Sequence, residues 1–368
     1  MPPIYNLIVE LDRDFAADPP AGIEIGAASP ADERTLSWID DEFGGAWSSE
    51  AYAGINVIAR RGGAPLAFAT VDAKGLKFAW LDGKAGEPDV GLFGPFGVAA
   101  SERGHGLGRC VLAAALNELR RRGYARALVA AVGDERLLQF YANAAGARVA
   151  ERFERASLHR PARRALIMAS GHGSNFQAVL DASRSGTLAL EIAGLLVNNP
   201  RAYALDRARD AGMSAVLTVV WEREKETRDA YDARLLEAAR SARPDLVLLL
   251  GWMHLLSESF VREFGQMLNL HPAFLPLDPR RDDVVTPNGA RIPAFRGPRA
   301  VRDALATSSP WVGATIHRVT AATDRGPVMA RKPLRVEPEE TEAHLMQRVH
   351  EVERGVVNAG IRRWIYER

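Results

Sequence analysis

The sequence predicts an α/β protein of two domains, of which the second is built on a mostly parallel sheet. At 368 residues, the chain is longer than one hydrophobic core comfortably supports. In its second half, the apolar runs at residues 164–170 and 246–250 are typical of buried strands, and small or polar turn residues follow each of them. Open sheets of this kind carry their chemistry at the carboxyl edge of the strands, so we expect a functional site there.

Composition restricts the classes of partner. The hydrophobic content of 47% is ordinary for a globular protein, and a formal net charge of +1 argues against binding to nucleic acid. The single Cys110 excludes a disulfide framework and favours a reducing cytoplasm. We expect neither a signal peptide nor a membrane span, because no apolar stretch approaches the roughly 20 residues that a span needs. The oligomeric state stays open.

Three polar residues of the second half have side chains suited to transfer chemistry at an amine. Asn269 and His271 lie in the run MLNLHPAFLP, residues 267–276, and Asp324 opens the run DRGP. An Asn amide can donate a hydrogen bond to an oxygen that becomes negative in a tetrahedral intermediate. A His can move the proton lost by the amine, and a nearby Asp can hold its tautomer and raise its pKa. Alone, Asn-x-His-Pro is explained equally well as a strand end with a turn.

A second motif, GHGSNFQ at residues 171–177, follows the first apolar run and opens a helix. Its small residues allow backbone N–H groups to approach an anion at the helix start. As a bare pattern, it is explained equally well as a tight turn that binds no nucleotide.

Residues 164–368 resemble the phosphoribosylglycinamide formyltransferases of purine synthesis from end to end. Beside the motifs above, GWMHLL at 251–256 and RVHEVE at 348–353 carry the resemblance. It implies a Rossmann-like domain that moves a formyl group from 10-formyltetrahydrofolate to the amine of glycinamide ribonucleotide. Neither a metal nor a covalent enzyme intermediate is expected.

The resemblance also implies roles for individual residues. Asn269 and a protonated His271 would stabilise the oxyanion, while Asp324 would support the His and a proton-relaying water. Three histidines, His254, His317 and His350, receive no catalytic role. The substrate-binding positions fall on Gly173, Ser174, Asn175, Arg228 and Glu353, and the folate-binding positions on Met253, Leu255 and Leu256.

One departure from the family concerns residues 277–292, where the family usually has only a few residues. The Asn288-Gly289 pair between short β-prone runs predicts a hairpin with a tight turn. It is either a lid or specificity element, or a passive surface insertion. The amine therefore stays open: an amino sugar or amino acid is one alternative, and hydrolysis of the formylated folate is another.

The first half contains a different motif. A predicted strand at residues 91–98 leads into SERGHGLGR, residues 101–109, and then into a helix over 110–122. The Arg-Gly-x-Gly-x-Gly turn presents free N–H groups and positive charge to a pyrophosphate. Together with LLQFYANAAGA at 137–147, this stretch resembles the GNAT acyltransferases.

That resemblance implies binding of acetyl-CoA or another acyl-CoA by Val98, Arg103, Gly104, Gly106 and Gly108, with Tyr141 as the acid for the departing thiolate. The region 38–47, with Asp40, Asp41 and Glu42, would shape a pocket for an amine acceptor. A structural or acyl-CoA-sensing domain without catalysis is the alternative.

We therefore expect a GNAT α+β domain at 1–155, a linker at 156–163 and a formyltransferase domain at 164–368.

Overall fold

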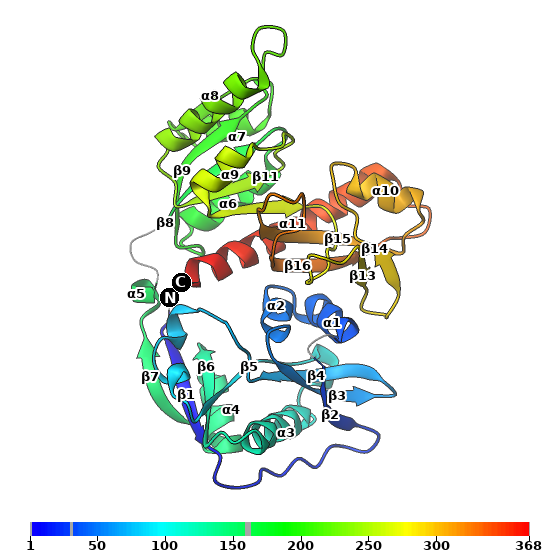
Figure 1. Ribbon diagram of the computed structural model, residues 1–368. Helices are drawn as coiled ribbons and strands as arrows, with labels where there is room; N and C mark the ends of the chain where they lie inside the picture. Colours follow the sequence, from blue (N-terminus) through cyan, green and yellow to red (C-terminus); the bar gives the residue numbers. More distant parts are fainter. Residues whose placement is uncertain (1, 30–31, 159–162, 368) are drawn as a thin grey trace.

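The computed structural model describes residues 2–29, 32–158 and 163–367, and these contain two seven-stranded sheets that follow one another along the chain (Figure 1). The predicted α/β class is confirmed. Part of the expected linker, at 159–162, lies outside the described residues. Among the described residues, no helix is long and apolar enough to cross a membrane.

The first sheet is mostly antiparallel, with the strand order β2-β3-β4-β5-β6-β1-β7. β5 and β6 run parallel and pair over residues 90–93 and 126–129. Beyond Phe93, β5 continues to pair with β4, so that β5 and β6 diverge. The strands are β1 (Ile4–Glu10), β2 (Glu24–Ala28), β3 (Ile55–Arg61), β4 (Ala64–Val71), β5 (Val90–Val98), β6 (Arg126–Val132) and β7 (Arg148–Phe153).

The main helix of this half, α3 (Leu107–Arg121), begins where Gly106 takes a left-handed conformation, three residues earlier than predicted. Its buried residues, among them Leu112, Leu116 and Leu119, recur at helical spacing and pack on the sheet. The other helices are α1 (Glu33–Phe43), α2 (Trp47–Ala51), α4 (Glu135–Ala145) and α5 (Arg155–Leu158), with 3-10 turns η1 (Ala79–Leu81), η2 (Lys84–Gly86) and η3 (Ala100–Glu102).

The second sheet has the order β10-β9-β8-β11-β12-β15-β16, in which the first five strands are parallel. The chain starts at β8, builds outward through β9 and β10, and then continues on the other side with β11 and β12. The strands are β8 (Arg163–Ala169), β9 (Leu190–Val197), β10 (Val216–Thr218), β11 (Leu246–Leu250), β12 (Met267–His271), β15 (Trp311–Arg318) and β16 (Val328–Arg335). The order reverses between β8 and β11, which is where sheets of this type bind ligands.

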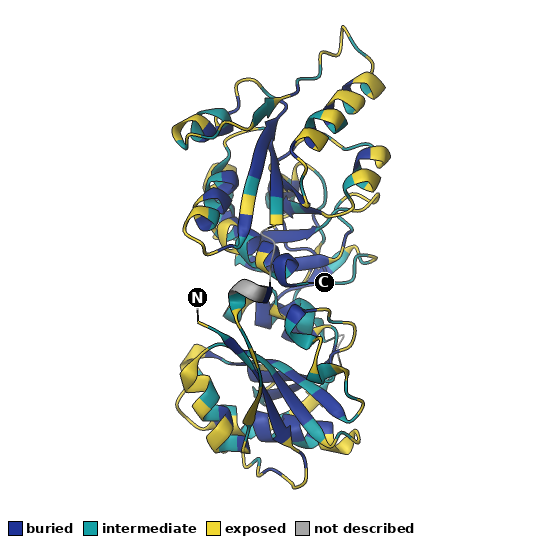
Figure 2. Cartoon of the chain, turned by 90° about the vertical axis from the view of Figure 1, so that its left-hand side faces the viewer, coloured by how far each residue is buried: buried dark blue, intermediate teal, exposed yellow. Residues whose placement is uncertain are grey.

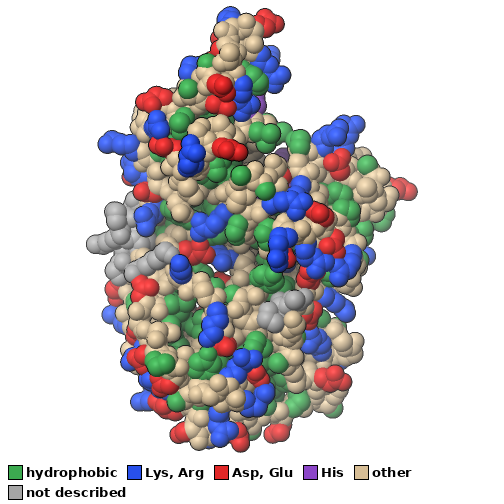
Figure 3. Space-filling model, viewed as in Figure 1, with side chains coloured by type: hydrophobic (Ala, Val, Ile, Leu, Met, Phe, Trp, Pro, Cys, Tyr) green, Lys and Arg blue, Asp and Glu red, His purple; other side chains and the backbone are tan. Residues whose placement is uncertain are grey.

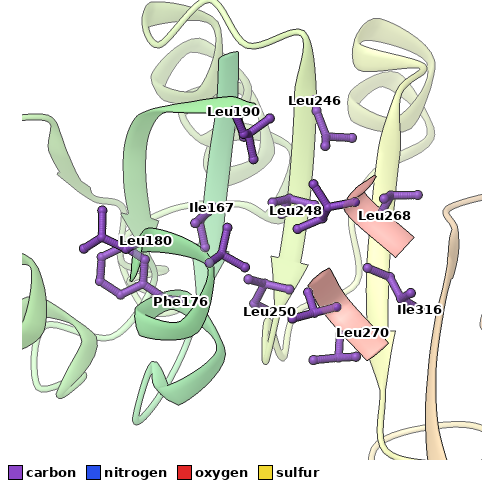
Figure 4. Close-up of a cluster of buried hydrophobic side chains, with 14 of the residues drawn as sticks. Ile167, Phe176, Leu180, Leu190, Leu246, Leu248, Leu250, Leu268, Leu270 and Ile316 are labelled. Atoms are coloured by element: carbon purple, nitrogen blue, oxygen red, sulfur yellow. The ribbon is translucent and has the colours of Figure 1, made fainter. Parts of the chain in front are cut away.

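Helices cover both faces of the second sheet, which explains its near-continuous apolar strands. Figure 4 shows Ile167, Leu248 and Leu268 on neighbouring strands, with Phe176 and Leu180 of α6 beside Ile167. Buried strands between partly exposed helices are seen in both halves (Figure 2). The helices are α6 (Ser174–Arg184), α7 (Ala204–Asp210), α8 (Arg228–Ser241), α9 (Glu258–Phe264), α10 (Ala300–Ala306) and α11 (Glu342–Tyr366).

The insertion at 277–292 contains the predicted hairpin, formed by β13 (Asp283–Val285) and β14 (Arg291–Pro293). Its turn spans residues 286–290, closed by the Thr286 N–H and the Ala290 carbonyl at 2.8 Å, and is wider than a two-residue turn. Val284 and Val285 are buried, so the hairpin is packed against the rest of the protein.

The two halves are in direct contact. α1 and α2 of the first half lie against β16 of the second (Figure 1). Asp40 of α1 and Arg331 of β16 form an ion pair at 2.8 Å, and their side chains are 0% and 2% exposed. On the face seen in Figure 3, cationic and anionic side chains are interspersed, which agrees with the small net charge.

Candidate active site

A cavity of about 720 Å³ opens at the carboxyl edge of β8, β11 and β12, beside the point where the strand order reverses. Its walls come from segments that lie far apart in the sequence. Ten of the predicted site residues line it: Gly173, Ser174, Asn175, Met253, Leu255, Leu256, Asn269, His271, Asp324 and Glu353.

One end of the cavity is formed by the turn before α6. Gly173 has a φ of +72°, and a Cβ at this position would lie 2.7 Å from the Ala204 Cβ and 2.9 Å from its Cα. Only glycine satisfies both the backbone angle and this close approach. The eleven-residue helix α6 begins at Ser174, so its free N–H groups and the positive end of its dipole face the cavity end.

Asn175 and Glu353 meet at this end, although 178 residues separate them. The Asn175 Nδ2 donates to Glu353 Oε2 at 2.7 Å, and both side chains are buried. Burial raises the pKa of Glu353 to about 7, even though the Asn175 hydrogen bond favours the carboxylate. Glu353 therefore changes charge near neutral pH.

The three catalytic residues predicted in this half form one cluster, in which the His271 and Asp324 side chains are buried. His271 Nδ1 lies 3.6 Å from Asp324 Oδ2, and the Asn269 Nδ2 donates to Asp324 Oδ1 at 3.3 Å. Asp324 has a φ of +52°, a strained conformation for a residue with a side chain, and such strain persists only where the surroundings hold it. The Gly297 N–H donates to Asp324 Oδ2 at 2.9 Å.

Burial and the neighbouring charges set the protonation of this cluster. Burial alone would raise the pKa of Asp324, but the hydrogen bonds from His317 and from the Gly297 N–H help to hold it well below its usual range. Burial lowers the pKa of His271 by more than Asp324 raises it. The ring is therefore neutral at pH 7, which corrects the expectation of a protonated His271 and makes it a proton acceptor.

His317 is the residue that the sequence interpretation missed. It faces Asn269 in the antiparallel register of β12 and β15, its Nε2 lies 3.5 Å from Asp324 Oδ1, and its side chain is 3% exposed. His350, also given no role, lines the cavity one helical turn from Glu353 on α11. The position of His317 beside Asp324 follows from the pairing of β12 with β15, and no local sequence motif indicates it.

The predicted folate-binding loop presents exposed apolar side chains to the cavity. Met253 and Leu255 are 61% and 70% exposed, although both are large and hydrophobic. Arg228 does not line the cavity among the described residues. Its guanidinium donates to Asp232 Oδ1 at 2.8 Å and to the Leu255 carbonyl, so the structure places Arg228 behind this loop and away from the turn at Gly173.

In the first half, the predicted acyl-CoA residues gather at the start of α3. Gly104 and Gly106 have φ values of +85° and +81°, and the Arg103 Nε donates to the Val98 carbonyl at 3.1 Å. The fifth residue, Gly108, lies in the first turn of the helix, against Val98.

Tyr141 lies on α4, where the rings of Phe93 and Phe140 pack edge-on against it. It is 5% exposed, and burial raises the pKa of its hydroxyl, which therefore keeps its proton at neutral pH. A protonated hydroxyl is what the predicted acid needs.

The predicted acceptor region is engaged elsewhere. Asp40 is paired with Arg331, and the Glu42 Oε1 accepts from the Ala100 N–H at 2.8 Å. The Asp41 carbonyl accepts from the Lys332 Nζ at 3.1 Å. The Asp40 carboxylate is therefore buried at the contact between the halves and does not face an acceptor pocket.

Comparison with known proteins agrees with this description. The formyl transferase family model matches residues 163–277 and 288–360, and the acetyltransferase (GNAT) family model matches residues 19–147. The matches leave out residues 278–287, within the insertion.

Several relatives match the second half. The phosphoribosylglycinamide formyltransferase of Escherichia coli (strain K12) is 30% identical over 192 residues, which are 52% of this chain and 82% of that protein. The trifunctional purine biosynthetic protein adenosine-3 of Drosophila melanogaster is 32% identical over 52% of this chain, and the matched part spans 13% of that longer protein. The crystal structure of glycinamide ribonucleotide transformylase 1 from Symbiobacterium toebii, 32% identical, covers 54% of this chain and 86% of its own, with a TM-score of 0.48. The chain thus carries a GNAT domain in its first half and belongs, through its second half, to the formyl transferase family.

Proposed function

We propose that this protein transfers a formyl group from 10-formyltetrahydrofolate to the amine of glycinamide ribonucleotide. The observation that carries the proposal is one cavity that holds both a buried Asn-His-Asp cluster and, at its other end, a helix start beside Glu353. The first supplies transfer chemistry, and the second suits a substrate with a phosphate and an amine or amide. Formyltransferase chemistry is assigned to 164–368 and acyl-CoA binding to 1–155, joined by 156–163.

In the proposed reaction, the substrate amine attacks the formyl carbon, and the carbonyl oxygen becomes negative. The Asn269 amide nitrogen donates to Asp324 Oδ1 at 3.3 Å and lies 3.2 Å from His317 Nε2, so the hydrogen on the His317 side is the one that turns to that oxygen in the reaction. Neutral His271 accepts the proton that the amine loses, and the Asp324 carboxylate at 3.6 Å stabilises the imidazolium that forms. The proton then returns to the departing folate nitrogen as the carbon–nitrogen bond breaks.

The apolar side chains of Met253, Leu255 and Leu256 suit a flat pteridine ring, and the backbone of the same loop can bond the ring edge. The turn at Gly173–Asn175 favours a phosphorylated amine over an amino sugar or amino acid without phosphate. It also argues against hydrolysis as the main reaction, because water needs no anion site.

The test is formylation of glycinamide ribonucleotide by the purified full chain, followed through both the formylated product and released tetrahydrofolate. We expect turnover that requires the ribonucleotide and is lost in His271→Ala. Folate release without any amine would indicate a hydrolase. Equal turnover with the unphosphorylated glycinamide riboside or with an amino sugar would reject the proposed substrate.

For the first half, the match to the GNAT family and a Tyr141 hydroxyl that keeps its proton favour an acyltransferase, and a non-catalytic acyl-CoA sensor is the alternative. Calorimetry with acetyl-CoA and measurement of free thiol with a panel of amines separate the two. Binding without thiol release supports the sensor, whereas amine-dependent release supports an acetyltransferase. A Gly106→Val variant, with its strained left-handed backbone, should weaken binding in either case.

A further inference from the structure

The insertion contacts both the first half of the chain and the catalytic cluster. On one side, Ser37 of α1 donates to the Val285 carbonyl, and Glu33 of α1 pairs with Arg281. Leu277 packs among apolar residues of α1 and the first sheet. The insertion therefore adheres to α1 through a buried hydrogen bond, an ion pair and an apolar contact.

On its other side, the insertion is joined to the Asp324 loop through Arg296. The guanidinium donates to the Arg281 carbonyl at 2.8 Å, to Asp282 Oδ1 at 3.1 Å and to the Asp324 carbonyl at 3.1 Å. A second arginine, Arg325, donates to the Pro279 carbonyl at 3.0 Å and to Asp282. The two guanidinium groups thus connect the insertion to the loop that carries Asp324: Arg296 bonds a backbone carbonyl of each segment, and Arg325 extends from the loop to a carbonyl of the insertion.

The residues directly after β14 also contact the side chains of His271 and Asp324. The Phe295 carbonyl lies 2.7 Å from His271 Nε2, which fixes the ring, and the Gly297 N–H bonds the Asp324 carboxylate at 2.9 Å. A shift of the insertion would therefore move the partners of His271 and Asp324 together. The strained backbone of Asp324, with its φ of +52°, depends on such partners.

We infer that the insertion is a strut through which α1 of the first half holds Asp324 in its catalytic position, and that Arg296 is a positioning residue of formyl transfer. This inference rests on the proposed function for its kinetic test, but its geometry does not. Residues 278–287 lie outside the match to the formyl transferase family, whereas residues 288–360 lie within it. Pro279, Arg281, Asp282 and Val285, which make the polar contacts of the strut, all lie in the unmatched segment.

The test removes the two polar contacts between α1 and the strut without touching the active site. In the double variant Glu33→Gln/Ser37→Ala, we expect the kcat of formyl transfer to fall about 10- to 100-fold, as small misplacements of catalytic groups do, with KM within about threefold. Lys332→Gln is the control, because it breaks a bond between the same helix and β16 that does not involve the strut. The control should keep the wild-type kcat.

A second readout needs no substrate. The charge of Asp324 raises the pKa of the His271 ring, against burial. NMR titration of labelled histidine should therefore give a lower pKa for His271 in the double variant than in wild type, and an unchanged pKa in Lys332→Gln. Equal kcat and equal titration in the double variant and the control would overturn the strut.

Arg296→Lys supplies a single-site test if the double variant folds poorly. A lysine cannot bond three acceptors in the plane of a guanidinium, so kcat should fall while KM is retained. Wild-type kcat in Arg296→Lys would overturn the role of Arg296. Absence of formyl transfer by the wild-type chain would instead reject the proposed function, and the histidine titration would still decide the strut.

Discussion

Replacing Asp324 by Asn tests the catalytic cluster most directly, because it removes a charge and almost preserves shape. The proposed transition state places a positive charge on His271, whose Nδ1 lies 3.6 Å from the carboxylate. With an effective dielectric constant of about 20, a unit charge pair at this distance is worth about 4.6 kcal/mol. Both side chains are almost fully buried, so solvent screens this interaction little.

An energy of that size corresponds to a fall in kcat of roughly 1,000-fold for Asp324→Asn. The loss applies only once His271 carries the proton, so KM for the ribonucleotide should stay within about threefold. The assay is steady-state formylation of glycinamide ribonucleotide at pH 7. Asp14→Asn is the matched control, since that carboxylate pairs with Arg120 at the surface of the first half. A fall in kcat below tenfold, or an equal fall in the control, would refute the assigned role of Asp324.

Three further predictions concern the anion end of the cavity and the contact between the halves. Gly173→Ala should lower stability by about 1–2 kcal/mol and weaken ribonucleotide binding in calorimetry, whereas Gly355→Ala, with open space around an added Cβ and away from the cavity, should do neither. The pKa of Glu353 is about 7 in the folded protein and ordinarily 4.5, so the folded state binds more proton than the unfolded state between these two pH values. The free energy of unfolding should therefore fall by roughly 3 kcal/mol as the pH rises through this window. The variant Glu353→Gln should remove this pH dependence in denaturant titrations. Asp40→Ala should cost about 3–5 kcal/mol, because it leaves the Arg331 charge buried without a partner, and Asp40→Leu/Arg331→Met should recover most of the loss; equal stability of the single and double variants would contradict this account.

Much of the site could be predicted because its motifs follow strand ends or open helices. Parallel strands bring their carboxyl ends to one edge, so a strand followed by polar residues already predicts where those residues meet. His271 at the end of β12 and the turn at Gly173 after β8 were predicted in this way, and both line the cavity. Their position depends on chain order and hydrophobicity, which the sequence contains directly.

What could not be predicted depends on pairings between distant segments. His317 reaches Asp324 only because β15 pairs with β12 in one particular register, and a shift by one residue would turn its side chain to the other face. The prediction that His271 is protonated was wrong for a related reason. An adjacent carboxylate predicts a raised pKa, but the degree of burial decides the balance and is a property of the packed structure.

The buried ion pair of Asp40 and Arg331 attaches the two halves to each other in addition to the chain that connects them. A carboxylate and a guanidinium that are both excluded from water are tolerated only when they meet, since each alone would carry a desolvation penalty of several kcal/mol. Arg331 also donates to the Leu275 carbonyl at 2.7 Å, four residues after His271. The same arginine that pairs with Asp40 therefore also holds the segment that follows His271. The two halves are therefore attached beside the segment that carries His271, through a pair of charges that are stable in the interior only while both are present.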